Sequence, residues 1–173
     1  MPSITITLVD HTQDSDDKLK NLIKSAIGDI FMDLISTSSD AAAVNIRWSA
    51  SPAAGDQDLV LHFVDDVDSS YVSQKMPGKA HRVDGGGFTR SDGARTGSEF
   101  YKMPVMGGKP SRLTAKGYAK LAAHEGMHNI TGMSNSEMHG RGGLASSPPQ
   151  LPVTDDNKAI VQAALGKIPA QLL

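Results

Sequence analysis

The sequence predicts an α+β fold, and we expect residues 1–173 to form a single domain. Three patterns support this prediction. A strand-like alternation of apolar and polar residues opens the chain, and a long amphipathic helix follows. Further along, a near-continuous apolar run is typical of a buried strand. We therefore expect a small twisted mixed sheet that packs on the long N-terminal helix and on a second helix from later in the chain.

The first third of the chain contains the clearest elements. Isoleucine and leucine alternate with threonine over residues 4–8, which predicts a half-buried strand. Apolar residues then recur at helical spacing from an acidic start at 15–17 to Leu34, and this predicts a helix of about five turns. Alternation returns over 44–48 and predicts a second strand. The apolar run 59–64 predicts a strand buried on both faces.

The middle of the chain is harder to interpret. From residue 65 to 110 the periodicity is lost and glycines are frequent, so only short strands around 80–83 and 100–105 are expected. A long irregular stretch in a compact domain is usually functional or mobile, although a plain surface excursion is the alternative. The run Gly85–Gly87 lacks the spacing and the strand-to-helix context of a phosphate-binding loop.

A second long helix is expected to begin near Ser111 or Thr114, both plausible caps, and to run to Ile130. Gly132 is a natural stop for it. Residues 133–153 are rich in Gly, Ser and Pro and are expected to form a loop.

A last helix is expected from a cap at Thr154, with Gly166 closing it.

Composition excludes several classes of function. The formal net charge is -2, without the basic excess typical of nucleic-acid-binding proteins, so we expect no nucleic-acid partner. The chain has no cysteine, which excludes disulfides, thiolate metal sites and cysteine nucleophiles. Any metal would have to be held by histidine and carboxylate ligands.

The N-terminal residues resemble a strand rather than a Sec signal peptide. No apolar stretch approaches the roughly 20 residues of a membrane span, so no membrane association is expected. The expected location is therefore the cytoplasm, or the exterior by a route other than Sec.

The residues that carry chemistry form the run His124-Glu125-Gly126-Met127-His128 on the second long helix. Residues four apart lie one turn apart on the same face, so His124 and His128 can point their imidazoles at one ion. Zn²⁺ accepts imidazole nitrogens at about 2.0–2.1 Å. Glu125 leaves the helix about 100° further round, where it can take a proton from a metal-bound water. The alternative is a solvated helix face without a metal.

This run resembles the HExxH motif of the zincin metallopeptidases, which carry it on an active-site helix below a twisted sheet, with substrate along an edge strand. The predicted order of strands and helices is similar to that arrangement. The resemblance implies a zincin-like fold, bound Zn²⁺, a peptide or protein substrate and Glu125 as general base. In sequence it covers the motif and a few residues after it.

The resemblance is metzincin-like with an atypical third ligand. Metzincins place a Gly three residues and a His six residues after the second His, positions held here by Thr131 and Ser134. No Met follows Met138 to form the downstream Met-turn. Gluzincins take the third ligand from a Glu further along the chain. Zincin variants with an Asp as third ligand would need an Asp soon after the motif, and none occurs between His128 and Asp155.

We favour His139 as the third metal ligand, because zinc hydrolases need three protein ligands and an open position. The loop 134–140 could fold back over the ion after the turn at Gly132. Glu137, or a group further away, remains an alternative ligand. Met138 could lie beneath the metal, although core packing is the simpler interpretation.

Other polar residues are weaker candidates. Arg141 or Tyr101 could stabilise an oxyanion by hydrogen bonding. His62 lies in a predicted buried strand and is expected to be a hydrogen-bonded core residue. His11 and His81 are expected in solvated turns or loops.

The sequence therefore favours a zinc-dependent peptidase, with His124, His128 and His139 as metal ligands and Glu125 as general base. A non-catalytic metal-binding structural or interaction module of a secreted or phage-like assembly is the alternative. Peptide deformylases share the motif but need a Cys ligand, and zincin-like ribonucleases lack the Glu. Compact zincin domains without a signal peptide or cysteine also occur among bacterial toxins and effectors, so the resemblance extends to them.

Overall fold

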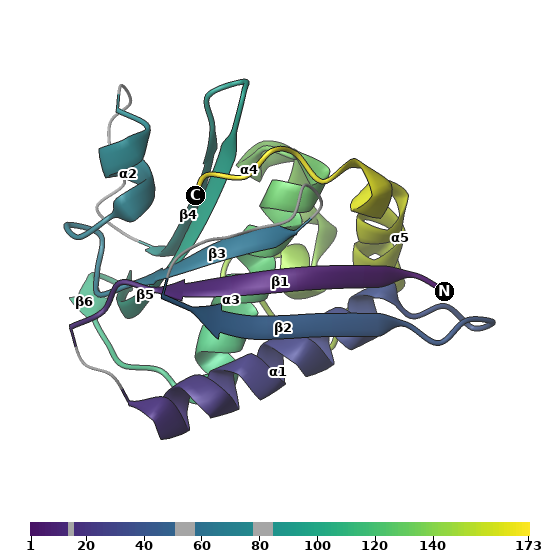
Figure 1. Ribbon diagram of the computed structural model, residues 1–173, viewed down its shortest axis with the longest axis horizontal. Coiled ribbons are helices and arrows are strands. Elements are labelled where there is room, and N and C mark those ends of the chain that lie inside the picture. The colour runs from purple at the N-terminus through teal and green to yellow at the C-terminus, as the bar shows by residue number, and fades with distance from the viewer. Residues whose placement is uncertain (14–15, 51–57, 78–84) are drawn as a thin grey trace.

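The computed structural model describes residues 1–13, 16–50, 58–77 and 85–173. They form a mixed β-sheet with helices packed against it (Figure 1). The predicted α+β class is confirmed at this level. The strand expected around 80–83 lies outside the described residues.

The sheet has six strands within the described residues, in the order β2-β1-β3-β5-β4 with β6 paired to β5. β1, β2, β3 and β5 run parallel to one another, whereas β4 and β6 are antiparallel to β5. β4 is thus an edge strand that runs opposite to the strand beside it. The strands are β1 (Ser3–Asp10), β2 (Ala43–Ser49), β3 (Leu59–Val64), β4 (Gly85–Ser91), β5 (Thr96–Met106) and β6 (Lys109–Pro110).

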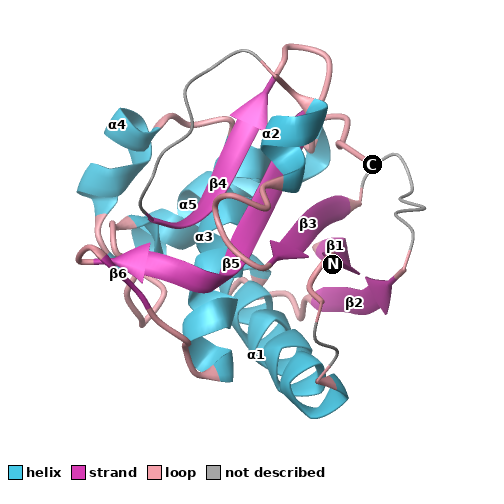
Figure 2. Ribbon diagram, turned by 90° about the vertical axis from the view of Figure 1, so that its left-hand side faces the viewer, coloured by secondary structure: helices cyan, strands magenta, loops and turns pink. Residues whose placement is uncertain are grey.

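Three helices pack together and against the sheet: α1 contacts α3 and β2, α3 contacts β3, β4 and β5, and α5 contacts both α1 and α3 (Figures 1 and 2). The short helix α2 contacts β4 and β5 and packs with Leu172. We call residues 168–172 the C-terminal segment. The helices are α1 (Asp17–Ile35), α2 (Tyr71–Lys75), α3 (Ala115–Thr131), α4 (Asn135–Met138) and α5 (Asp155–Ala164).

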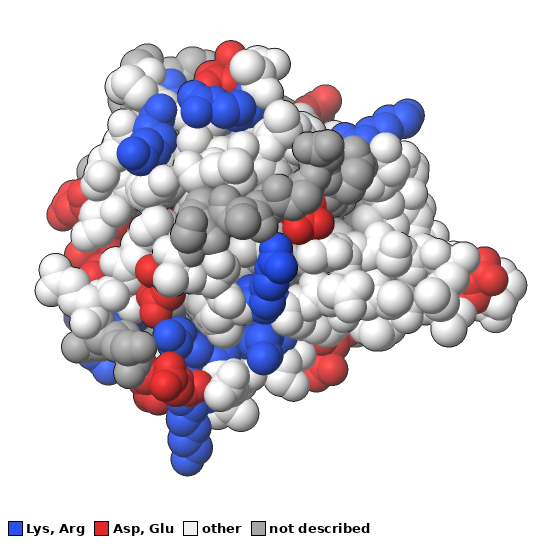
Figure 3. Space-filling view, viewed as in Figure 1, with Lys and Arg blue, Asp and Glu red and all other residues white. Residues whose placement is uncertain are grey.

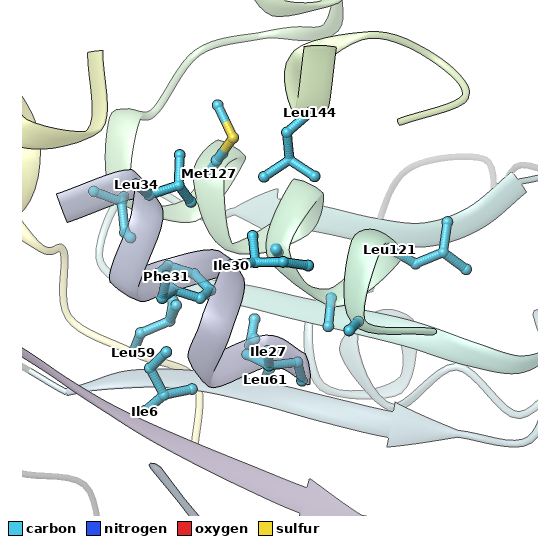
Figure 4. Packing of buried hydrophobic residues seen from close by; sticks show 14 of the residues in the cluster. Ile6, Ile27, Ile30, Phe31, Leu34, Leu59, Leu61, Leu121, Met127 and Leu144 are labelled. Carbon is cyan, nitrogen blue, oxygen red and sulfur yellow. The ribbon is translucent and has the colours of Figure 1, made fainter. Parts of the chain in front are cut away.

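β3 is buried along its whole length, as the sequence predicts. Leu59, Leu61 and Phe63 belong to the main core cluster, which α1 and α3 complete (Figure 4). The alternate residue His62 faces the other way and contacts the C-terminal segment through the carbonyl of Leu172. Because elements cover both faces, a continuous apolar run is what this position requires.

The other long elements predicted for the first third are also confirmed. β1, α1 and β2 extend the expected ranges by one or two residues at most of their ends. Asp16 caps α1 by accepting a hydrogen bond from the amide of Leu19 at 3.1 Å. In the second half, Thr114 caps α3 and Gly132 ends it in the left-handed conformation, and Thr154 caps α5.

Two irregular stretches contain more structure than the sequence predicts. The strand expected around 100–105 is confirmed as part of β5. The segment 65–110 also includes α2 and the seven-residue strand β4, so its interpretation as otherwise largely irregular is wrong. The predicted loop 133–153 likewise includes α4 and two 3₁₀ turns. β4 begins with three glycines, which have low strand propensity, and α4 is a single turn.

α3 packs closely against α1 and β3 at Gly126. A Cβ atom there would lie 2.9 Å from Cζ of Phe31 and 3.1 Å from Cδ2 of Leu59. Figure 4 shows both of these side chains in the core. Gly28, in the middle of α1, is different, because a Cβ there would meet only Cγ2 of Ile46, at 3.9 Å. Gly126 and Gly28 therefore have opposite roles.

We expect Gly126→Ala to lower the free energy of unfolding by about 1–3 kcal/mol, because the new methyl group overpacks the core. The matched Gly28→Ala should raise it by about 0.5–1 kcal/mol, because alanine costs less backbone entropy in a helix. Urea unfolding of both variants measures this difference. Stabilisation of similar size in both would show that α3 does not need the close contact.

Candidate metal centre

Two histidines project from one face of the C-terminal half of α3. His124 and His128 are one turn apart and are only 6% and 7% exposed. Their ring centroids lie 4.9 Å apart with the planes at 86°. The helix places them together because i and i+4 side chains share a face.

Backbone carbonyls fix the orientation of both rings. His124 Nδ1 lies 2.8 Å from the carbonyl oxygen of Leu144, and His128 Nδ1 lies 2.7 Å from that of Met133. A carbonyl can only accept, so each Nδ1 carries the proton and Nε2 keeps a lone pair in the neutral ring. This outer hydrogen bond is the arrangement typical of metal-binding histidines.

The chain that follows α3 brings His139 to the same place. It reverses at Gly132 (φ 67°), forms α4, and continues into a 3₁₀ turn that contains His139. His128 Nε2 and His139 Nε2 are 3.3 Å apart. One ligand nitrogen from each of His124, His128 and His139 lies within 4.8 Å of the others.

These distances suit a single ion. Two nitrogens bound at 2.0–2.1 Å to a tetrahedral ion are about 3.3 Å apart, the separation of the His128 and His139 nitrogens. Burial lowers the pKa of His124 to about 4, although its bond to Leu144 opposes the shift. Burial also lowers the pKa of His128. Both rings are therefore neutral near pH 7 and have lone pairs to offer, so the three histidines could hold a metal ion.

Glu137, the alternative third ligand, is engaged elsewhere. Its carboxylate accepts hydrogen bonds from the amide and the hydroxyl of Ser134, both at 2.7 Å, and so caps the start of α4. These bonds hold the pKa of Glu137 below its usual value. The residue is exposed, and the structure brings His139 rather than Glu137 beside the other two histidines.

Glu125 projects from α3 toward the edge strand β4. It is 7% exposed, and its Oε2 accepts a hydrogen bond of 2.6 Å from Thr89 Oγ1. A Cβ atom on Gly87 would lie 2.6 Å from Glu125 Cγ and 2.9 Å from its Oε1. The carboxylate therefore fits against β4 only because position 87 has no side chain.

The three histidines and Glu125 line one cleft of about 1260 Å³. All of β4 forms part of its wall, together with the second half of α3 and the turn after it. The end of α5 and a proline-containing segment, 147–149, form further parts. The cleft is large enough for several residues of an extended chain.

The two residues considered for oxyanion stabilisation do not line this cleft, which corrects that hypothesis. Tyr101 is 3% exposed and donates its hydroxyl proton to Glu99 at 3.1 Å, and burial is the main cause that raises its pKa. Arg141 forms an ion pair of 2.9 Å with Asp156. Met138 is fully buried in the main core cluster, as expected from simple packing.

His11 and His62 lie outside the cleft. His62 is fully buried with Nε2 3.2 Å from the carbonyl oxygen of Leu172 and Nδ1 2.9 Å from His11 Nε2, so its interpretation as a hydrogen-bonded core residue is confirmed. His11 is exposed overall, as predicted, yet its ring stacks on Tyr71. His81 lies outside the described residues.

Sequence reasoning missed Thr89 and the glycines beside it. Thr89 is 36 residues from Glu125, and no spacing rule connects them. Thr89 follows three glycines and a phenylalanine, and this short sequence is not typical of any functional motif. Only the pairing of β4 with β5 shows that this segment lies over α3.

Comparison with known proteins gives no family assignment: no protein-family model matches the chain, and no curated protein matches it significantly. Within the described residues, no helix is both long and apolar enough to cross a bilayer. On the face seen in Figure 3, cationic and anionic side chains are interspersed. The case for function therefore rests on the geometry of the site.

We expect His139→Ala to weaken Zn²⁺ binding by at least about a hundredfold, because loss of a ligand should cost at least as much as loss of an outer-sphere partner. Glu137→Gln is the matched control and should bind Zn²⁺ as the unaltered chain does. Competition with a chromogenic chelator measures both affinities. If Glu137→Gln bound Zn²⁺ more weakly and the Zn²⁺ affinity of His139→Ala were unchanged, Glu137 would be the third ligand instead of His139.

His62 should make the protein sensitive to acid. Burial, aided by the nearby His11, lowers the pKa of His62 from 6.5 to about 4, so the unfolded chain binds the proton more readily. Stability should therefore fall as the pH drops from 6.5 to 4, by about 3 kcal/mol from this group.

His62→Gln should remove that part of the pH dependence, because glutamine can still donate to Leu172 but does not titrate in this range. Urea unfolding of both metal-free proteins between pH 8 and pH 4 measures the difference in slope. Parallel curves would contradict the assignment.

Proposed function

We propose that this protein is a zinc-dependent metallopeptidase of the zincin type, with Glu125 as its general base. The observation that carries the proposal is the convergence of His124, His128 and His139 beside Glu125 in one cleft. Three imidazoles with an adjacent carboxylate are a donor set suited to Zn²⁺-dependent hydrolysis.

The chain's own contribution begins with the ligands. The carbonyls of Leu144 and Met133 hold two of the imidazoles in one tautomer and one orientation. A bound Zn²⁺ would act as a Lewis acid toward the scissile carbonyl and lower the pKa of the attacking water. Three protein ligands leave one tetrahedral position open for this chemistry.

Glu125 is suited to move the proton. Its carboxylate would take one proton from the attacking water as the oxygen bonds to the carbonyl carbon. It would then give that proton to the leaving nitrogen as the C–N bond breaks, which balances the reaction. The low exposure of Glu125 supports this role, because a shielded carboxylate exchanges its proton with bulk water less readily.

The edge strand β4 supports a peptide as the substrate. All seven of its residues line the cleft, and within the described part of the chain its ladder partner is β5 alone. A strand at the edge of a sheet can bind an extended peptide through main-chain hydrogen bonds. The zincin resemblance implies the same placement of substrate.

The subgroup that this site resembles most is the metzincins, with an altered path to the third ligand. In place of the short metzincin spacing, His139 comes eleven residues after His128. The turn of α4 takes up the additional residues, and its buried Met138 anchors that turn in the core. A three-histidine set is therefore compatible with this spacing.

Glu125→Gln should lower kcat for peptide hydrolysis by about 10²- to 10⁴-fold, because the amide cannot accept the proton. Zn²⁺ should still bind at one ion per chain, since no ligand changes. Cleavage of a quenched fluorescent peptide library, with metal content by mass spectrometry, measures both.

Full activity in Glu125→Gln would refute the mechanism. An unaltered chain that binds no Zn²⁺ at neutral pH, or that holds it with four protein ligands and cleaves nothing, would favour the metal-binding module instead.

A further inference from the structure

Glu125 lies at one end of a chain of hydrogen bonds that reaches the C-terminal segment. Thr89 Oγ1 donates to Glu125 Oε2 at 2.6 Å and lies 2.9 Å from Ser98 Oγ. Asn129 Nδ2 donates to Ser98 Oγ at 3.0 Å and to Gln171 Oε1 at 3.0 Å. These side chains join β4, β5, α3 and the C-terminal segment, and Ser98 and Asn129 are fully buried.

The far end of this network has a fixed direction. Gln171 Nε2 donates to the carbonyl of Pro169 at 2.7 Å and to Asn129 Oδ1 at 2.8 Å, and the amide of Val60 donates to Gln171 Oε1 at 3.3 Å. Backbone carbonyls only accept and backbone amides only donate. The Pro169 carbonyl and the Val60 amide therefore determine which atom of the Gln171 side-chain amide is the nitrogen. The hydrogen bonds between the two side-chain amides then determine the orientation of Asn129.

The near end has the same direction. A distance of 2.6 Å is typical of a hydroxyl that donates to a carboxylate, and an ionised carboxylate can only accept. The same hydroxyl lies 3.1 Å from the carbonyl oxygen of Glu125, and the shorter bond assigns its single proton to the Glu125 carboxylate. Because the proton of Thr89 is used in this way, Thr89 accepts from Ser98 at 2.9 Å, a shorter distance than the 3.4 Å between Ser98 Oγ and the carbonyl oxygen of Glu125. Ser98 in turn accepts from Asn129.

We propose that Thr89 is a positioning residue for Glu125, and that Ser98, Asn129 and Gln171 keep its proton directed at the carboxylate. This inference rests on the proposed function, because Thr89 acts through the general base. Gly87 lies two residues before Thr89 on β4, and a Cβ there would come within 2.9 Å of Glu125 Oε1, so the strand leaves the carboxylate few orientations and the bond to Thr89 selects one of them.

The chain offers a direct spectroscopic test, because it contains three glutamates: Glu99, Glu125 and Glu137. Protein labelled with ¹³C at the glutamate carboxyl should give three resonances, and Glu125→Gln identifies the one that belongs to Glu125. Thr89→Val, in the metal-free protein at fixed pH, should shift or broaden that resonance and leave the Glu137 resonance in place. Thr89→Ser, which keeps the hydroxyl, should restore it.

Kinetics provide the second measurement. Thr89→Val should lower kcat about tenfold to a hundredfold with little change in KM, the loss expected for a hydrogen bond to a charged group. Thr89→Ser should recover most of that loss. Gln171→Met, which removes the far anchor, should move the Glu125 resonance less and lower kcat about two- to tenfold.

Thr7→Val is the matched control for the loss of a buried strand hydroxyl, because Thr7 lies on β1 and bonds Arg47 at 3.3 Å. It should leave both the Glu125 resonance and kcat unchanged. An unmoved Glu125 resonance in Thr89→Val, or a kcat equal to that of the unaltered enzyme, would overturn the positioning role.

The two proposals fail in different ways. A Glu125 resonance that responds to Thr89→Val and recovers in Thr89→Ser, in a chain that cleaves no peptide, would support the hydrogen-bond network and refute the peptidase. Peptide cleavage by the chain, with a Glu125 resonance and a kcat that do not change in Thr89→Val, would support the peptidase and refute the positioning role.

Discussion

The candidate site depends on how closely α3 approaches the elements on both of its sides. Gly126 lets the helix pack on α1 and β3, and glycines of β4 let the edge strand lie over the opposite face. A Cβ at Gly86 would come within 2.2 Å of Leu121 Cδ2, and one at Gly87 would come within 2.6 Å of Glu125 Cγ. Larger residues would force strand and helix apart. The distance between the carboxylate and its hydroxyl donor follows from this packing.

A second constraint comes from the way α3 ends. The reversal at Gly132 returns the chain across the end of the helix, so that the carbonyl of Met133 can accept from His128. The same segment continues through α4 to His139 and then to Leu144, whose carbonyl accepts from His124. One stretch of chain therefore orients two of the imidazoles and supplies the third, which is the kind of preorganisation that metal sites require.

The sequence was informative wherever side chains face one continuous core. The periodicity of α1, the alternation of β1 and the apolar run of β3 all reflect burial, so these elements were predictable. The i, i+4 histidines on α3 were predictable for the same reason, because helix geometry alone relates them.

Features that depend on contacts between distant segments were not predictable. β4 looks like a loop in the sequence because its glycines have no side chains to form a strand pattern. The contact with α3 needs these positions to have no side chain. A histidine eleven residues after His128 was visible, but its path through α4 was not. Tyr101 and Arg141 look available in the sequence, and only the structure shows that Glu99 and Asp156 engage them.

The polar network beside Glu125 follows from the same packing. Ser98 and Asn129 are enclosed between β5 and α3, where an unpaired donor would cost free energy. Each needs a partner, and the backbone groups at Pro169 and Val60 allow one direction of donation. The orientation of the hydroxyl at Glu125 is thus a consequence of how the C-terminal segment docks on the sheet. A change at that segment can reach the carboxylate by reorienting side chains, without any movement of α3.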